Sequence, residues 1–257
     1  MDLNLKGKRA LVTGGSKGIG KACAQVLAEE GCDVTIASRD AALLEAAAAD
    51  IKAKTGVAVK WKSADLSQKG VAEELAAAVG ELDILVNNAG AIPGGDLLSV
   101  NEDTWRRSWD LKVFGYINLT RAVYAQMKAK KKGAIINVLG NAGEKLNAAY
   151  LAGSTANAGL MAFTRALGGA SHADGIRVVG VSPGPVATDR LLSLYKQMAQ
   201  TKLGDASRYA ELFAGMAFNR PATPEEIAWT VAFTASDRSS YTTGIYITVD
   251  GGLAARS

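Results

Sequence analysis

Cysteine and histidine are scarce in this chain of 257 residues, which holds two cysteines, Cys23 and Cys32, and one histidine, His172. Two thiols are too few for a disulfide framework, and such low cysteine usage is typical of a reducing compartment. We therefore expect a cytoplasmic protein. A lone histidine without a cluster of cysteines does not fit a zinc-type centre, so we expect no metal site.

Long apolar runs are missing as well. No run approaches the roughly 18 residues that a membrane-spanning helix needs. The first residues, MDLNLKGKRALVTGG, lack the apolar core and the cleavage site of a secretory signal. The net charge is only +4, and the one basic run, 128–132, falls at the end of a predicted helix, where cations complement the helix dipole. We expect neither a membrane nor a nucleic acid as partner.

What the chain does have is a regular alternation of short apolar runs with amphipathic segments. The pattern predicts strands at 9–13, 33–38, 57–62, 84–87, 134–139, 177–181 and 245–249. It predicts helices at 18–30, 39–54, 67–79 with Ser67 as N-cap, 102–130, 148–168 and 224–234, and irregular helix over 189–222. Continuous apolar strands that alternate with helices are typical of a parallel sheet covered on both faces. We expect a single doubly wound, Rossmann-like α/β domain over residues 1–257.

A glycine-rich loop, TGGSKGIG at 13–20, links the first predicted strand to the first helix. Glycines at this point allow a tight turn and a close approach of the backbone to a pyrophosphate, which rests on the helix N-terminus. A glycine triplet alone is a weak signal, but between the first strand and the first helix of an α/β chain it predicts a dinucleotide-binding loop.

The chain resembles the short-chain dehydrogenase/reductase family along nearly its whole length. The loop is similar to the family's TGxxxGIG fingerprint, and NNAG at 87–90 follows the fourth predicted strand. Further matches are Asp65-Leu66, PGPVAT at 183–188, YTTG at 241–244 and VDGG at 249–252. The resemblance implies that Asp65 contacts the adenine and that the 183–188 segment holds the nicotinamide carboxamide. The cofactor contacts that it implies are Gly14, Ser16, Lys17, Gly18, Ile19, Gly20, Asp65, Leu66, Asn88, Ala89, Gly90, Pro183, Gly184, Val186 and Thr188.

The end of the second strand indicates which dinucleotide is bound. NAD enzymes of this type carry an acid there to bind the ribose diol, whereas this chain has Ser38. Arg39 follows it, and Lys17 lies in the glycine loop. Because two cations can hold a 2′-phosphate, we expect NADP(H) rather than NAD(H) as cofactor, unless both are simply solvated surface charges.

The resemblance breaks at the catalytic positions. The family uses a Tyr with a Lys four residues later, a Ser thirteen residues before the Tyr, and an Asn on the preceding long helix. Anchored on FTRAL at 163–167, an ungapped alignment places Gly153, Asn157, Gly140 and Lys112 at these positions. To use Tyr150 as the family tyrosine would need a three-residue insertion within a helix. Asn157 still has the reach to contact a ribose hydroxyl, so we count it among the cofactor contacts.

Two nearby side chains are candidates to replace the lost proton donor. Lys112 projects from the long helix towards Asn157, and a desolvated lysine can act as an acid or base. Tyr150 lies one turn before Gly153 and, in a continuous helix, shares a face with Gly153, Ser154 and Asn157. The alternative is that Tyr150 packs in the pocket wall and that Lys112 is a surface residue with a buried stem.

Two functions fit these observations. The first is an NADP(H)-dependent oxidoreductase with a divergent active site, acting on a carbonyl or alcohol that the sequence does not identify. The alternative is a dinucleotide-binding protein without turnover, acting as a sensor or partner subunit. The apolar segment 189–222 would form a lid over a small-molecule substrate. The helix 154–167 is rich in small residues (Ala156, Ala158, Gly159, Ala162), which predicts a homodimer or homotetramer in which these helices pair, as in the family.

Overall fold

One seven-stranded parallel sheet runs through the computed structural model, which describes residues 1–256. Its strand order is β3-β2-β1-β4-β5-β6-β7, and all neighbouring strands are parallel. The strands are β1 (Arg9–Thr13), β2 (Asp33–Ser38), β3 (Lys60–Ser63), β4 (Ile84–Asn87), β5 (Gly133–Val138), β6 (Ile176–Pro183) and β7 (Ile245–Val249). The order reverses direction between β1 and β4, which is the point where open α/β sheets bind ligands.

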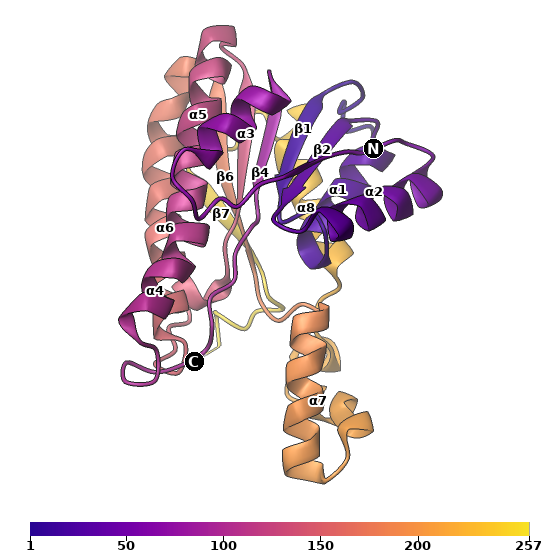
Figure 1. The fold of residues 1–257 in the computed structure, drawn as a ribbon, viewed down its shortest axis with the longest axis vertical. Coiled ribbons are helices and arrows are strands. Elements are labelled where there is room, and N and C mark those ends of the chain that lie inside the picture. The colour runs from indigo at the N-terminus through magenta and orange to yellow at the C-terminus, as the bar shows by residue number, and fades with distance from the viewer. Residues whose placement is uncertain (257) are drawn as a thin grey trace.

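Helices cover both faces of this sheet (Figure 1). They are α1 (Gly18–Glu29), α2 (Ala41–Thr55), α3 (Val71–Val79), α4 (Glu102–Trp109), α5 (Gly115–Lys130), α6 (Leu151–Ser171), α7 (Asp189–Leu203) and α8 (Pro224–Ala235). One apolar core lies between the sheet and α1, α2 and α8, and a second lies beneath α3 and α5. The expected doubly wound α/β fold is confirmed.

Local capping explains where two helices begin later than the sequence pattern predicts. The Asp40 carboxylate accepts a hydrogen bond from the Leu43 amide at 3.1 Å, so α2 starts at Ala41 rather than at residue 39. The predicted N-cap Ser67 is wrong, because its amide and hydroxyl donate to Asp65 and form a separate turn. Gly70, at φ +84°, is the residue that precedes α3.

The start of α6 also moves, and this changes the position of Tyr150. The amide of Gly95 donates to the Ala149 carbonyl and the amide of Leu151 donates to the Gly95 carbonyl, so the backbone at 149–151 is paired with a loop. Helix α6 therefore begins at Leu151, and Tyr150 is its N-cap in a non-helical conformation with φ −141° and ψ 45°. The expectation that Tyr150 is part of a continuous helix with Gly153 and Asn157 is wrong for this reason, although its ring does lie beside Gly153.

The helix predicted over 102–130 is present, but it contains a π-helical turn at Asp110–Phe114 between α4 and α5. This turn carries Lys112. The extra residue in a π-turn rotates the side chains that follow relative to an α-helix, and such turns occur frequently at functional sites.

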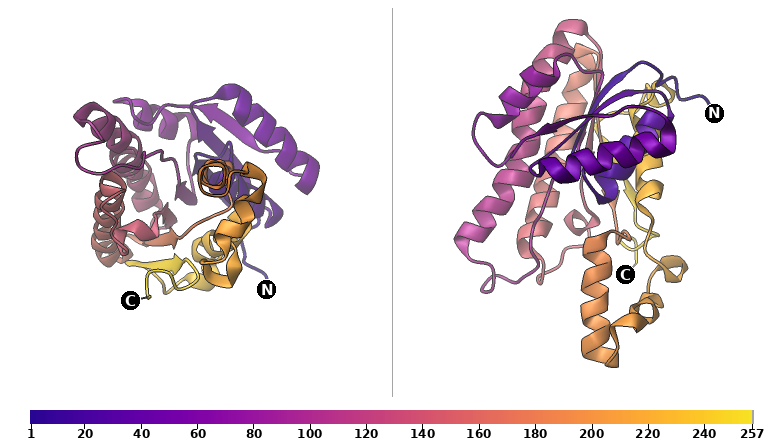
Figure 2. Two further views of the ribbon diagram at one scale, coloured as in Figure 1. Left: turned by 90° about the horizontal axis from the view of Figure 1, so that it is seen from below. Right: turned by 45° about the vertical axis from the view of Figure 1, so that its right-hand side comes forward.

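Helix α7 leaves the carboxyl edge of the sheet and projects beyond the body of the molecule (Figures 1 and 2). A 3-10 segment, Ala206–Phe213, packs back along it. The two are joined by aromatic contacts, with the ring centroids of Tyr195 and Phe213 5.0 Å apart. The predicted irregular helix over 189–222 is thus one regular helix followed by short turns that return the chain to α8.

Candidate functional site

A cleft of about 760 Å³ lies at the carboxyl edge of the sheet, at the β1/β4 reversal. Most of the predicted cofactor contacts line it: Gly14, Ser16, Lys17, Gly18, Ile19, Arg39, Leu66, Asn88, Ala89, Gly90 and Thr188. The remaining predicted contacts, Gly20, Asp65, Asn157, Pro183, Gly184 and Val186, are not part of this wall. Lys112 and Arg190 line the same cleft.

The glycine loop is shaped by residues that tolerate no side chain. Gly14 and Gly18 have φ of +67° and +55°, a region that favours glycine. A Cβ at Gly14 would lie 2.8 Å from the Asn88 side-chain nitrogen, and one at Gly20 would overlap the Gly14 carbonyl oxygen. The backbone therefore packs closely behind the loop and leaves the first turn of α1 open towards the cleft.

The Thr13 hydroxyl ties this loop to the segment after β4. It accepts hydrogen bonds from the amides of Asn88 at 2.9 Å and Ala89 at 3.1 Å, and it is fully buried. The Asn88 side chain donates to the Thr13 carbonyl at 3.0 Å. Asn88 thus positions the cleft wall through its side chain, a role that the sequence did not reveal.

At the end of β2 the cleft carries positive charge and an unused hydroxyl. The Ser38 hydroxyl oxygen is buried and has no hydrogen-bond partner among the described residues. Arg39 and Lys17 are exposed beside it, and within residues 1–256 neither forms an ion pair with a carboxylate. Asp65 lies further along, and its carboxylate is engaged by Ser67 at 2.8 Å.

Lys112 points into the cleft. Its ammonium donates to the Leu139 carbonyl at 3.3 Å and lies 5.7 Å from the centroid of the Tyr116 ring. Its stem crosses Gly90, where an added Cβ would come within 2.9 Å of it. Burial lowers the pKa of Lys112 to about 8, and the positive charge of Arg190 acts in the same direction. Lys112 is thus half-buried, with its stem against Gly90 and its ammonium in the cleft.

Gly140 and Asn157 lie against each other at the end of β5. A Cβ at Gly140 would be 3.2 Å from the Asn157 side-chain nitrogen. That nitrogen donates to the Gly153 carbonyl at 2.8 Å, while the amide oxygen is buried without a partner. Asn157 is only 2% exposed, so its side chain is part of the wall behind the cleft.

The Tyr150 ring fills the space beside Gly153. A Cβ at residue 153 would overlap the ring, with Cζ as the nearest atom. The Tyr150 hydroxyl therefore lies near the position that a Cβ at residue 153 would take. A tyrosine at 153 would instead place its own hydroxyl beyond the far end of its ring, away from that Cβ. Burial raises the pKa of Tyr150, an effect that the charge of Arg190 opposes.

Arg190, which sequence reasoning missed, lies close to both candidates. Its Nη2 donates to the Ile92 carbonyl at 2.6 Å, and Ile92 packs in one cluster with Tyr150 and Trp109. No motif marks Arg190, because it is the second residue of α7 and only the tertiary fold brings it to the loop after NNAG. Asp189 also lines the cleft, but within the described residues it makes no ion pair with Lys112 or Arg190.

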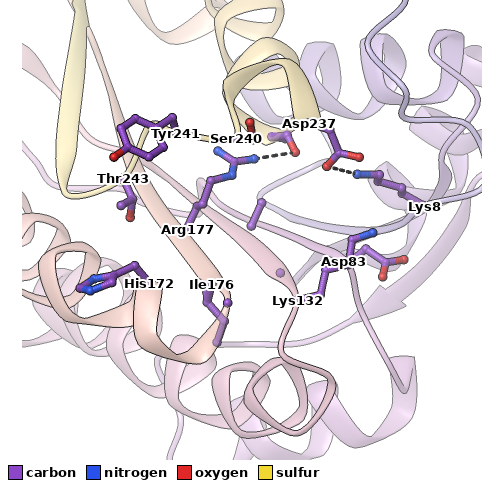
Figure 3. Close-up of a pocket in the computed structure, with 14 residues that line it drawn as sticks. Lys8, Asp83, Lys132, His172, Ile176, Arg177, Asp237, Ser240, Tyr241 and Thr243 are labelled. Atoms are coloured by element: carbon purple, nitrogen blue, oxygen red, sulfur yellow. Dashed lines mark hydrogen bonds and ion pairs between the residues drawn. The ribbon is translucent and has the colours of Figure 1, made fainter.

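A second cavity, of about 530 Å³, opens at the opposite, amino edge of the sheet (Figure 3). Its charges are largely engaged. Lys8 pairs with Asp237 at 2.7 Å, and the Arg177 guanidinium donates to the carbonyls of Thr234, Ala235 and Ser236 at the end of α8. This arrangement caps a helix, so we place the functional site at the carboxyl edge.

A doubly wound sheet with a glycine loop at its reversal point defines a dinucleotide-binding type of α/β protein. A family model described as short chain dehydrogenase matches residues 8–199. The chain therefore belongs to the short-chain dehydrogenase/reductase family, as the sequence motifs predicted, and this is a family of oxidoreductases. Among residues 1–256 no helix is long and apolar enough to cross a membrane, and no group of three potential metal-ligating side chains occurs.

Relatives match the chain from end to end. It is 33% identical over 258 residues to 3-oxoacyl-acyl-carrier-protein reductase FabG of Chlamydia muridarum, with 99% of this chain and 100% of that protein covered. The protein of the same name from Escherichia coli is 35% identical over 257 residues, with 98% and 99% covered. L-sorbose reductase from Gluconobacter frateurii, solved with NADPH and L-sorbose, matches with a TM-score of 0.92 at 31% identity and covers 100% of both chains.

The overlap between Tyr150 and residue 153 gives a stability prediction. Gly153→Ala should destabilise the fold by about 1–3 kcal/mol, because the added methyl group displaces the ring. In a Tyr150→Ala background the same change should stabilise by up to about 1 kcal/mol, the usual helix gain of alanine over glycine. Urea unfolding of the four proteins measures this coupling.

The matched control is Gly169→Ala, on the same helix, where an added Cβ meets nothing within 4 Å. If Gly153→Ala is as well tolerated as Gly169→Ala in the otherwise unchanged protein, the Tyr150 ring does not occupy the space described.

Proposed function

We propose that this protein is a cytoplasmic NADP(H)-dependent oxidoreductase that uses Lys112 in place of the family's usual proton donor. The observation that carries the proposal is the position of the Lys112 ammonium, which lies inside the cofactor cleft at the end of β5. The resemblance places Gly140, Gly153 and Asn157 at the remaining catalytic positions, so these contribute no acidic hydrogen. The substrate is a carbonyl compound or the corresponding alcohol.

The cleft supports NADP(H) as cofactor through its own residues. The first turn of α1 and the glycine loop would receive the pyrophosphate. The Ser38 hydroxyl, Arg39 and Lys17 would bind the 2′-phosphate. The phosphate oxygens would accept hydrogen bonds from all three, and its negative charge would pair with the two cations. Thr188 and the 183–188 segment would hold the carboxamide. When bound, the cofactor supplies or accepts a hydride.

Lys112 then acts as the general acid or base. In the direction of reduction, the ammonium donates a hydrogen bond to the carbonyl oxygen and transfers its proton as the oxygen becomes a hydroxyl group. The neutral amine that results takes up a proton from solvent. In the direction of oxidation, the amine removes the hydroxyl proton. A lysine with a pKa of about 8 is suited to both steps near neutral pH. Tyr150 is the second candidate, and its hydroxyl lies nearer to Gly153.

A lid and an oligomer complete the proposal. Helix α7 and the turns that follow it, over 189–222, would close on the substrate and exclude water. On α6 the small residues that are exposed include Thr155, Gly159, Ala162 and Ala166. Ala156, in contrast, is buried against Ile92 and takes no part in this face. We propose that the exposed face pairs with a second copy in a homodimer or homotetramer.

Cofactor preference gives the first test. NADPH should bind at least about tenfold more tightly than NADH, because each charged hydrogen bond to the 2′-phosphate contributes about 1.5–3 kcal/mol. Arg39→Ala should remove most of that preference while NADH affinity changes little. Fluorescence titration of both cofactors measures it. Equal affinities in the unchanged protein, or the same ratio in Arg39→Ala, would contradict the assignment.

Lys112→Met should lower turnover by about 10²–10⁴-fold, the usual contribution of a positioned acid. NADPH affinity should stay within a few-fold, since the substitution keeps the apolar stem. The rate of carbonyl reduction should also decline as the pH rises through about 8, because Lys112 loses its proton there. Oxidation should show the opposite trend.

The control for the lysine is Tyr150→Phe, which keeps the ring over Gly153 and removes only the hydroxyl. If Tyr150→Phe loses activity and Lys112→Met has little effect, Tyr150 rather than Lys112 is the proton donor. Absence of turnover in the unchanged protein across a broad set of carbonyl compounds would favour the alternative, a dinucleotide-binding sensor or partner subunit.

The oligomer can be checked by light scattering at micromolar concentration. We expect a particle of at least twice the chain mass of 26.7 kDa. Ala162→Arg should shift it towards the monomer, because a long charged side chain prevents close approach of two helices. A monomer in the unchanged protein would refute the proposed assembly.

A further inference from the structure

The substrate end of the cleft holds two cations and no paired acid. Lys112 and Arg190 both line it, and within residues 1–256 neither lies within 4.0 Å of a carboxylate oxygen. Asp189, which precedes Arg190 in the chain, lines the same wall without pairing to either. Two cations that share a cleft and form no ion pair favour an anionic ligand.

Arg190 is an exposed residue whose side chain is tied to the cleft wall at one point. Its Nη2 hydrogen bond of 2.6 Å to the Ile92 carbonyl fixes one edge of the guanidinium. Ile92 packs with Tyr150, so the guanidinium lies beside the ring that fills the space at Gly153. No other hydrogen bond of this side chain occurs within the described part of the chain, and its remaining N–H groups are available for a planar acceptor.

We propose, on the basis of the oxidoreductase function above, that the substrate is a short oxo acid or the corresponding hydroxy acid, whose carboxylate is bound by Arg190. A carboxylate matches the guanidinium fork with two parallel hydrogen bonds. With the carboxylate on Arg190, the ketone oxygen is directed towards Lys112. Arg190 is thus a specificity-determining residue, while Lys112 serves the reacting oxygen.

The glycine at 153 is consistent with this class of substrate. The space beside residue 153 holds the Tyr150 ring, and residue 153 adds no side chain of its own. Arg190 is held on the Ile92 carbonyl and Lys112 on the Leu139 carbonyl. A small substrate with two polar ends would bridge these two cations, whereas a neutral ketone would form no charged hydrogen-bonded pair with Arg190.

The experiment compares each acid with its neutral methyl ester. Acetoacetate and methyl acetoacetate, and 2-oxobutanoate and its methyl ester, are assayed by NADPH oxidation in the unchanged protein. The variants are Arg190→Gln and, as control, Lys69→Gln, which removes an exposed charge outside the cleft wall and the lid. For at least one pair, kcat/KM should favour the acid by about tenfold or more, as expected for a charged hydrogen-bonded pair. This preference should fall to about threefold or less in Arg190→Gln and persist in Lys69→Gln.

Turnover of neutral ketones or esters without preference for either acid would overturn the oxo-acid proposal and leave the oxidoreductase function intact. If nothing is turned over, the oxidoreductase function fails, and binding decides the oxo-acid proposal. In that case the acid, but not the ester, should change the fluorescence of bound NADPH in the unchanged protein and not in Arg190→Gln. Equal binding of acid and ester, or a loss of NADPH affinity of more than about tenfold in Arg190→Gln, would assign Arg190 to another role and overturn the proposal.

Discussion

One buried hydroxyl, that of Thr13, fixes the geometry on which the cleft depends. By accepting hydrogen bonds from the amides of Asn88 and Ala89, it holds the segment after β4 against the glycine loop. Two consequences follow along that segment. Gly90 is placed where the Lys112 stem can cross it, and the Ile92 carbonyl is placed where Arg190 donates to it. Both cations therefore take their positions from the junction of β1 with β4.

Two glycines, Gly140 and Gly153, border the end of the cleft where we propose that the substrate binds. The space beside Gly153 is filled by the Tyr150 ring, and the space beside Gly140 is bordered by the Asn157 amide. Neither glycine has a side chain that could supply a proton. The positive charge supplied by Lys112 and Arg190 instead suits an oxyanion and a carboxylate. The cofactor end carries the sequence motifs typical of the family.

The sequence was sufficient to predict the fold class, the cleft and the family, because these depend on local signals. Strand-helix alternation, the loop at 13–20 and NNAG at 87–90 each lie within one short segment. Tyr150 was misplaced because its conformation is set by backbone pairing with Gly95, some 55 residues away in the chain. Arg190 was missed for a similar reason, since its partner Ile92 lies on a distant loop. Lys112 was named as a candidate because the resemblance places it at a family catalytic position, and its catalytic role stays a prediction. The π-turn that carries it left no readable signal in the sequence.

The central claim is that the Lys112 ammonium stands at the reacting carbonyl. A crystal structure of the unreactive complex with NADP⁺ and acetoacetate tests it most directly. The account predicts the Lys112 Nζ within about 3 Å of the ketone oxygen, with Arg190 on the carboxylate. If Lys112 remains on the Leu139 carbonyl or turns to solvent while another side chain contacts the ketone oxygen, the claim is contradicted.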